Sequence, residues 1–91
     1  RIDVEWNRET VETYPVRIHI RSDDRVGLLA DLAATMSKEG ANILTANSEI
    51  RENGSVDSLF TLAVHDTDHL NRVMAAIRRL KLIREVRRIK T

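Results

Sequence analysis

Apolar residues recur at every second position in two segments of the chain, which is the spacing of a strand with one buried face. The first segment covers residues 16–20 and the second covers residues 56–64, where Ser58 is the one polar residue of the series. Residues 41–51 are predicted to form a further strand, because the Asn53-Gly54 pair that follows them is typical of a hairpin whose residues tolerate positive φ. The central part of the chain therefore reads as a β-hairpin that follows an earlier strand.

Two other segments place apolar residues at helical spacing. Asp24 is predicted to cap the first helix, since its carboxylate can accept from the free amides of the next turn, and Gly40 is predicted to close that helix. Asp66 or Thr67 is predicted to cap the second helix. The apolar positions are Leu28, Leu29, Leu32, Ala33 and Met36 in the first helix, and Leu70, Val73, Met74, Ile77 and Leu80 in the second.

Residues 82–90 are predicted to form the last strand, with a bulge because Ile83, Val86 and Ile89 break strict alternation. The element order is then β-α-β-β-α-β. Two right-handed crossovers in one sheet give an antiparallel strand order of 4-1-3-2 with both helices on one face. This is an α+β, ferredoxin-like sandwich. Its other face is expected to carry Arg17, His19, Arg21, Asp57 and Thr61.

Residues 1–14 are interpreted as the end of a preceding domain and a linker, and residues 15–91 as one further domain. Ile2, Val4 and Trp6 alternate with polar residues as in a short strand, and a polar stretch then leads to Pro15. The first residue is Arg, so we expect the chain to be a fragment.

Composition narrows the class of protein. The chain has 91 residues, which is enough for one domain, and no apolar run approaches the roughly 20 residues of a membrane helix. It has no cysteine and no secretory signal pattern, which fits a cytoplasmic protein without disulfides or thiolate metal sites. No membrane partner is expected.

The net charge of +1 conceals an asymmetry, because residues 72–91 carry +7 and residues 1–71 carry −6. A basic end of this kind suits either contact with an anionic partner or a solvated surface. The candidate contacts for an anionic partner are Arg78, Arg79, Arg84, Arg87 and Arg88.

No catalytic site, metal site or cofactor is predicted. The serines lack a nucleophile-elbow context, and three glycines form no phosphate loop. His65 and His69 have a spacing that can bind a metal on a helix, but no third ligand is evident, so they are interpreted as exposed histidines beside a turn. Binding of single-stranded RNA by base stacking is disfavoured, because the chain has one Phe, one Tyr and one Trp.

Small-molecule binding remains as a candidate function for the loop at residues 23–29. A helix N-terminus attracts carboxylates and phosphates, and Gly27 permits close approach of a ligand. Asn42 offers a donor and an acceptor but starts its strand, so it reaches this loop only across a dimer. Packing of Gly27 on the sheet is the alternative.

Several of these segments resemble a known family. Residues 14–20, Asp24-Arg25-Val26-Gly27-Leu28-Leu29-Ala30-Asp31-Leu32, Asn42-Ile43 and Val86-Arg87-Arg88-Ile89 resemble the ACT domain at the C-terminal end of long RelA/SpoT proteins, the (p)ppGpp synthetase-hydrolases of the stringent response. Val4-Glu5-Trp6 resembles the end of the small domain that precedes it. The resemblance implies a parent GTP pyrophosphokinase that transfers pyrophosphate from ATP to GTP or GDP, with catalytic domains outside this fragment.

The resemblance also implies a regulatory role. ACT domains of other enzymes bind amino acids at a dimer interface, so it suggests a homodimer, contacts with other domains of the parent enzyme and an amino-acid ligand. A docking module for ribosomal RNA or for another protein, without a small ligand, is the alternative. The implied ligand-binding residues are Asp24, Arg25, Val26, Gly27, Leu28, Asn42 and Ile43.

Overall fold

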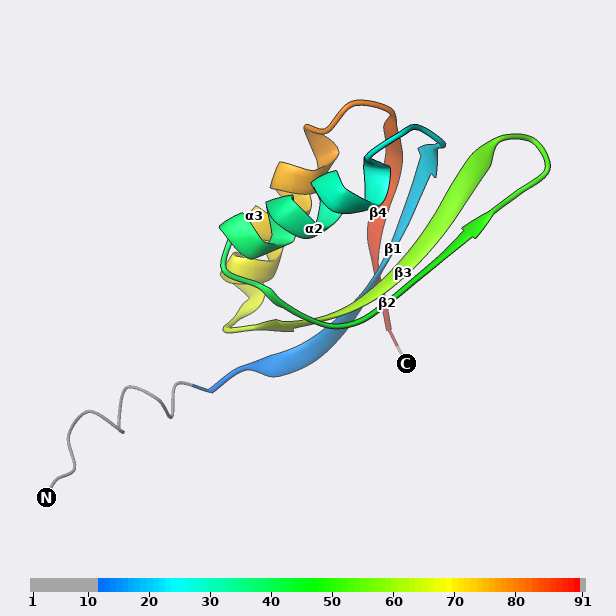
Figure 1. Ribbon diagram of the computed structural model, residues 1–91. Coiled ribbons are helices and arrows are strands. Elements are labelled where there is room, and N and C mark those ends of the chain that lie inside the picture. The colour runs from blue at the N-terminus through cyan, green and yellow to red at the C-terminus, as the bar shows by residue number, and fades with distance from the viewer. Residues whose placement is uncertain (1–11, 91) are drawn as a thin grey trace, which may run out of the picture.

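The computed structural model describes residues 12–90 (Figure 1). The strand predicted at residues 2–6, interpreted as the end of a preceding domain, lies outside the described residues. The predicted domain boundary between residues 14 and 15 stays a prediction. The elements are β1 (Tyr14–Asp23), α2 (Leu28–Lys38), β2 (Asn42–Ile50), β3 (Ser55–Val64), α3 (Thr67–Arg78) and β4 (Ile83–Ile89).

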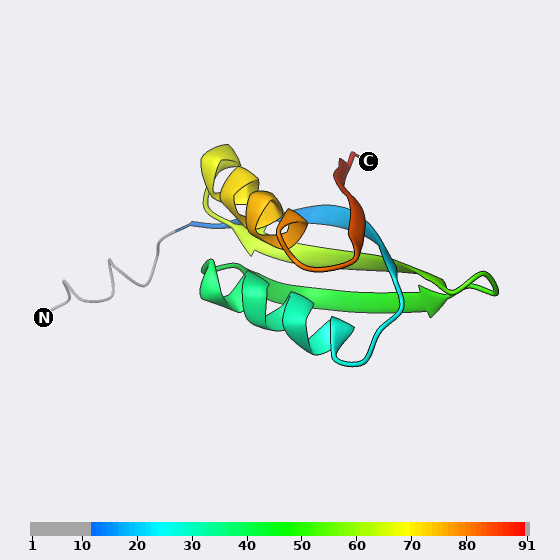
Figure 2. The same ribbon diagram turned by 90° about the horizontal axis from the view of Figure 1, so that it is seen from above.

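The four strands form one antiparallel sheet in the order β2-β3-β1-β4, and both helices cover the same face (Figures 1 and 2). This confirms the predicted order and the α+β, ferredoxin-like class. The two edge strands, β2 and β4, lie on opposite sides of the molecule, and the tip of the β2–β3 hairpin projects beyond the helices (Figure 2). No helix among the described residues is long and apolar enough to cross a membrane.

The predicted alternation places the core correctly. Every second residue of β3 from Val56 to Val64 is buried, and the even-numbered residues of β1 from Val16 onward are buried beside them. Their partners on α2 and α3 complete one apolar layer between sheet and helices. Burying a large aliphatic or aromatic side chain stabilises a fold by roughly 1.5–3 kcal/mol. The largest fully buried apolar side chains are Phe60, Ile18, Ile20, Leu32, Met36, Leu62 and Ile77.

Two predicted helix ends are confirmed. Gly40 has φ 84° and donates to the Ser37 carbonyl (2.9 Å), while Ala41 donates to the Met36 carbonyl (3.0 Å). These bonds form a Schellman motif, in which a glycine in the left-handed region ends the helix. Asp66 caps α3, and its carboxylate accepts from the His69 N–H at 2.7 Å.

Asn53 and Gly54 both tolerate positive φ, but only one of them adopts it in the hairpin turn. Gly54 alone does so, with φ 87°. The Asn53 side chain instead accepts from the N–H of Ser55 (3.0 Å) and from its hydroxyl (2.7 Å). Gly54 N–H donates to the Arg51 carbonyl (3.0 Å), so the chain turns over three residues rather than two.

The predicted bulge in β4 is confirmed. Arg21 pairs with Glu85 and Ser22 pairs with Ile83, so Arg84 is the extra residue of β4. Leu82, just before the strand, has φ 69°, a conformation that the sequence analysis did not predict.

Candidate functional site

The connection between β1 and α2, residues 24–27, is tied to two other connections of the fold. The Asp23 N–H, at the end of β1, donates to the Leu82 carbonyl (3.1 Å), and the Asp24 N–H donates to the Gly54 carbonyl in the β2–β3 turn (3.0 Å). Three connections therefore meet at this end of the sheet.

The prediction that Asp24 caps α2 is wrong. The helix begins at Leu28, after Gly27 with φ 80°, and no side chain caps its first turn. The backbone of Asp24 is instead bound to the hairpin turn, which delays the start of the helix. The N–H groups of Leu29 and Ala30 have no acceptor within residues 12–90. They leave two donors at the positive end of the helix for an anionic group.

A hollow of about 260 Å³ lies beside this helix start. Four of the predicted ligand residues, Asp24, Arg25, Gly27 and Leu28, line it, whereas Val26 is outside its lining and 99% exposed. The hollow combines the uncapped helix start with apolar side chains from three elements. Its other lining residues are Leu29, Ala30, Ser48, Ile50 and Val56.

Arg25 fixes the loop against the first turn of α2. Its guanidinium donates to the Asp31 carboxylate (2.7 Å) and to the Val26 carbonyl (3.3 Å). Its Nε is buried and has no hydrogen-bond partner among the described residues. The side chain therefore retains one unused donor in a largely buried position.

Asn42 and Ile43 lie at the other end of β2. Asn42 pairs with Ala63, whereas Ile50, which lines the hollow, pairs with Val56. At roughly 3.3 Å per residue, Asn42 is about 26 Å along the strand from Ile50. The fold does not bring all the predicted ligand residues together within one chain.

The predicted anion contacts near the C-terminal end differ in how they are engaged. Arg84 donates to Asp23 through Nε (3.3 Å) and a terminal nitrogen (2.5 Å), and Arg87 lies 3.6 Å from Glu85. Arg78 donates to the backbone carbonyl of Val86 (3.0 Å). Arg79 and Arg88 are exposed.

The contact between Asp23 and Arg84 shifts the pKa values of both residues. The hydrogen bonds from Arg84 lower the pKa of Asp23, and the same contact raises the pKa of Arg84. Both groups are therefore held in their charged forms.

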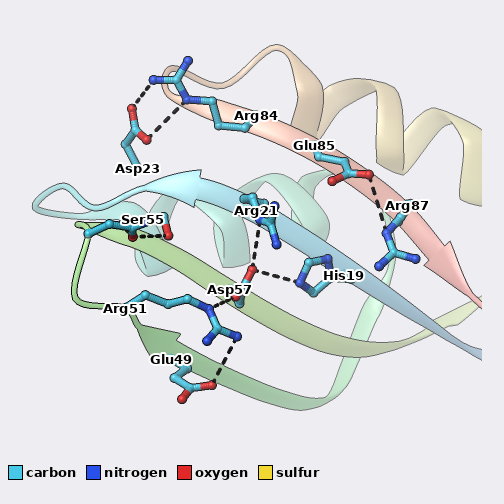
Figure 3. A network of polar contacts seen from close by, with 11 residues as sticks. His19, Arg21, Asp23, Glu49, Arg51, Ser55, Asp57, Arg84, Glu85 and Arg87 are labelled. Atoms are coloured by element: carbon cyan, nitrogen blue, oxygen red, sulfur yellow. Dashed lines mark hydrogen bonds and ion pairs between the residues drawn. The ribbon is translucent and has the colours of Figure 1, made fainter.

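A second polar cluster lies on the sheet face opposite the helices (Figure 3). Asp57 on β3 accepts from His19 (3.1 Å), from Arg21 (3.4 Å) and from Arg51. The hydrogen bond from Arg51 makes the largest contribution to lowering the pKa of Asp57. The sequence analysis predicted His19, Arg21 and Asp57 on this face. It did not predict Arg51, although polar residues recur at every second position from Asn47 through Glu49 to Arg51.

The cluster around Asp57 joins three parts of the sheet rather than presenting a free reactive group. Its carboxylate is surrounded by donors from β1 and from the β2–β3 turn. It therefore stabilises the polar face.

The interpretation of His65 and His69 as exposed is wrong for His69, which is 3% exposed. Its Nδ1 accepts from the His65 N–H (3.0 Å), and its Nε2 donates to the Glu39 carbonyl at the end of α2 (2.8 Å). Both ring nitrogens are thereby used, which leaves no lone pair for a metal. Within residues 12–90, no three His, Cys, Asp or Glu side chains gather in a group that could hold a metal ion.

Comparison with known proteins places these features in context. A model of the ACT domain family matches residues 10–88. A GTP pyrophosphokinase of Myxococcus xanthus is 35% identical to this chain over 89 residues, 98% of this chain and 12% of that protein. A probable guanosine-3′,5′-bis(diphosphate) 3′-pyrophosphohydrolase of Synechocystis is 31% identical over 90 residues, 97% of this chain and 12% of that protein.

The fold also matches a solved structure, the ACT domain from the GTP pyrophosphokinase of Chlorobium tepidum. Its TM-score is 0.74 at 23% sequence identity, with 85% of this chain and 99% of that chain covered. The matches in sequence and in fold confirm the resemblance stated from the sequence. The chain spans about 12% of the length of the first two curated relatives.

Proposed function

The chain belongs to the ACT domain family, and we propose that it is the regulatory module of a longer enzyme that makes or degrades (p)ppGpp in the cytoplasm. In this proposal, pyrophosphoryl transfer from ATP to GTP or GDP takes place in other domains of the parent enzyme. The observation that carries the regulatory role is the hollow beside the uncapped start of α2, which offers a place for a ligand. The identity of the parent enzyme is inferred from the relatives of this chain.

The chemistry of this hollow suits an α-amino acid. The N–H groups of Leu29 and Ala30 are placed to bind its carboxylate, and Asp24 is placed to attract its ammonium group. Ile50 and Val56 offer apolar contacts to an aliphatic side chain. We therefore propose an amino acid with an aliphatic side chain as the ligand class.

The exposure of β2 supports assembly with a second copy. Eight of the nine residues of this edge strand are exposed, among them Leu44 at 50% and Ile50 at 65%. Glu49 is its one charged residue, whereas unpaired sheet edges are ordinarily protected by several charges or by proline. We propose that β2 pairs antiparallel with β2 of a second copy.

This pairing would also complete the ligand site. An antiparallel partner strand runs in the opposite direction, so the Asn42 end of the partner subunit's β2 would lie beside the Ile50 end of the first. Asn42 and Ile43 of the partner subunit would then approach the hollow, which joins the predicted ligand residues in one two-chain site.

A thermal-shift screen of this chain with the twenty amino acids tests the proposal. One or a few aliphatic amino acids should raise Tm in a concentration-dependent way, because a ligand at about 100 times its Kd adds roughly 2.7 kcal/mol. The Gly27→Val variant, which places a branched side chain at the hollow, should lose the response. A screen in which no amino acid raises Tm would contradict amino-acid binding.

A second candidate function is docking to an anionic partner such as ribosomal RNA. The observation that favours it is the +7 charge of residues 72–91, with Arg79 and Arg88 exposed. Binding of this kind weakens steeply with salt. RNA affinity of the double variant Arg87→Glu/Arg88→Glu should fall strongly at low salt if the basic end docks, and should stay constant if it is only solvated.

A further inference from the structure

The two edges of the sheet differ in whether a side chain covers their backbone. On β4, the Arg78 guanidinium at the end of α3 donates to the Val86 carbonyl (3.0 Å). Val86 is the middle residue of β4 (Ile83–Ile89). Two copies of β4 that paired about a two-fold axis would meet near this carbonyl.

The direction of the Val86 carbonyl follows from the pairing of β1. The Asp23 N–H donates to Leu82, so the backbone groups of Asp23 face β4. Backbone groups of consecutive strand residues face opposite neighbours, so those of Ile20, three residues earlier, face β3. Val86 pairs with Ile20, and its backbone groups therefore face away from the sheet. Arg78 thus occupies the outer edge of β4.

The same reasoning leaves the outer edge of β2 open. The Arg51 N–H donates to the Ser55 carbonyl (2.8 Å), so the backbone groups of Arg51 face β3. Those of Ile50, Ser48 and Ala46 then face outward. Within residues 12–90 these outward groups have no hydrogen-bond partner.

We propose that Arg78 closes the β4 edge against a second copy of the chain, so that edge pairing is confined to β2. The claim that pairing is confined to β2 rests on the proposed function. The closure of β4 rests only on the bond from Arg78 to the Val86 carbonyl.

The physical consequence is a closed assembly. A chain with two self-complementary edges would pair at both, and such contacts extend into an open series of copies. A chain with one usable edge stops at two copies. Arg78 therefore limits the size of the assembly without taking part in the interface.

Sedimentation velocity over a wide range of protein concentration tests the role of Arg78. The Arg78→Ala variant should form species larger than those of the wild type, and their share should grow with concentration. Arg79→Ala is the matched control, because it removes the same charge from the next residue without removing an edge contact, and it should match the wild type. Equal distributions for Arg78→Ala and Arg79→Ala would overturn the proposal.

The Ala46→Pro substitution tests the pairing of β2 independently of the closure of β4. The missing N–H of proline affects only the outer edge of β2, where proline is tolerated. Ala46→Pro should reduce a wild-type dimer to a monomer, and Ala46→Pro/Arg78→Ala should dimerise again through β4. If the wild type is already a monomer, the β2 pairing fails, while dimers of Arg78→Ala would still support closure of β4.

Circular dichroism and urea unfolding establish that each variant is folded. Arg78→Gln, which keeps a helix-forming side chain but cannot reach as far, carries the same expectation as Arg78→Ala. If both variants fold and both sediment like Arg79→Ala, Arg78 does not close the edge.

Discussion

The connection from β1 to α2 and the connection from β3 to α3 occupy equivalent places in the two β-α-β halves, yet they are built differently. The second consists of His65 and Asp66, and Asp66 caps α3 at once. The first has four residues, and α2 starts without a side-chain cap. One connection is closed by its own side chains, and the other leaves donors and a hollow open.

This difference between the two connections suggests that one contributes to stability and the other to ligand binding. The second connection also holds His69, which links the start of α3 to the end of α2. The first is held by backbone bonds to other connections and by side-chain contacts at the surface. If the second connection supports the fold while the first is available to a ligand, side chains of the second should contribute more to stability than side chains of the first.

The largest effect is expected for His69→Ala in the second connection. The substitution removes a buried ring and leaves the His65 N–H and the Glu39 carbonyl without their partners. Lost packing and two unsatisfied backbone groups should together lower the free energy of unfolding by about 2–3 kcal/mol. Urea unfolding at pH 7 measures the change.

His65→Ala is the control for this substitution. The His65 side chain is exposed, and the contact with His69 that matters comes from the backbone N–H of His65, which alanine keeps. A change within about 0.5 kcal/mol is expected. The rings of His65 and His69 stack, with their centroids 5.1 Å apart. Equal losses in both variants would mean that this stacking, and not the bridge to α2, carries the effect.

The next effect concerns Gly27 in the first connection. Gly27 has φ 80°, and a Cβ at this position would meet no atom within 4 Å. Gly27→Ala should therefore cost about 1–2 kcal/mol through backbone conformation alone. Gly27→Asn should cost less, because Asn visits the left-handed region more readily. Thermal unfolding of the two variants checks this order, and equal stability of Gly27→Ala and the wild type would contradict it.

A pair of substitutions compares the two connections directly. Asp66→Ala removes a helix cap and should lower the free energy of unfolding by about 1 kcal/mol. Asp24→Ala removes the acid that precedes the other helix but caps nothing, so a change below about 0.5 kcal/mol is expected. Similar losses from the two variants, measured by urea unfolding, would remove the distinction between the connections.

The sequence predicted the features that depend on local pattern. The alternation in β3, the cap at Asp66 or Thr67 and the helix end at Gly40 each depend on a few neighbouring residues. The structure confirms them, with Asp66 as the cap. Asp24 resembles Asp66 in sequence, because both acids lie just before an apolar helical pattern. In the structure, Gly27 with φ 80° lies between Asp24 and the start of α2, and the Asp24 N–H is bound to the Gly54 carbonyl. No local pattern contains that long-range bond.

The candidate site was predictable in part for the same reason. The loop residues from Asp24 to Leu28 are consecutive, and the fold places all of them except Val26 around the hollow. Ser48 and Ile50 were missed, because their approach depends on the register of β2 against β3. Arg78 was predicted as an anion contact, and its bond to Val86 depends on the path of α3 over the sheet.

The smallest effect is expected for Asp23, whose ion pair with Arg84 beside the first connection is exposed. Arg84 holds the pKa of Asp23 below its ordinary value of 3.8. The contribution of this pair is therefore fully present above the ordinary pKa and is lost as the pH falls through the lowered pKa of the folded state. Because an exposed ion pair contributes little, Asp23→Asn should change the free energy of unfolding only slightly near pH 7. Below about pH 4, the free energy of unfolding of the variant should fall less steeply with pH than that of the wild type. Urea unfolding across this range checks the slope, with Asp57→Asn, also a carboxylate of lowered pKa, as the comparison. An unchanged slope in Asp23→Asn would mean that the contact with Arg84 does not persist in solution.

A connection held by so weak an ion pair can rearrange around a ligand at little cost to the fold, whereas the connection closed by Asp66 and His69 cannot.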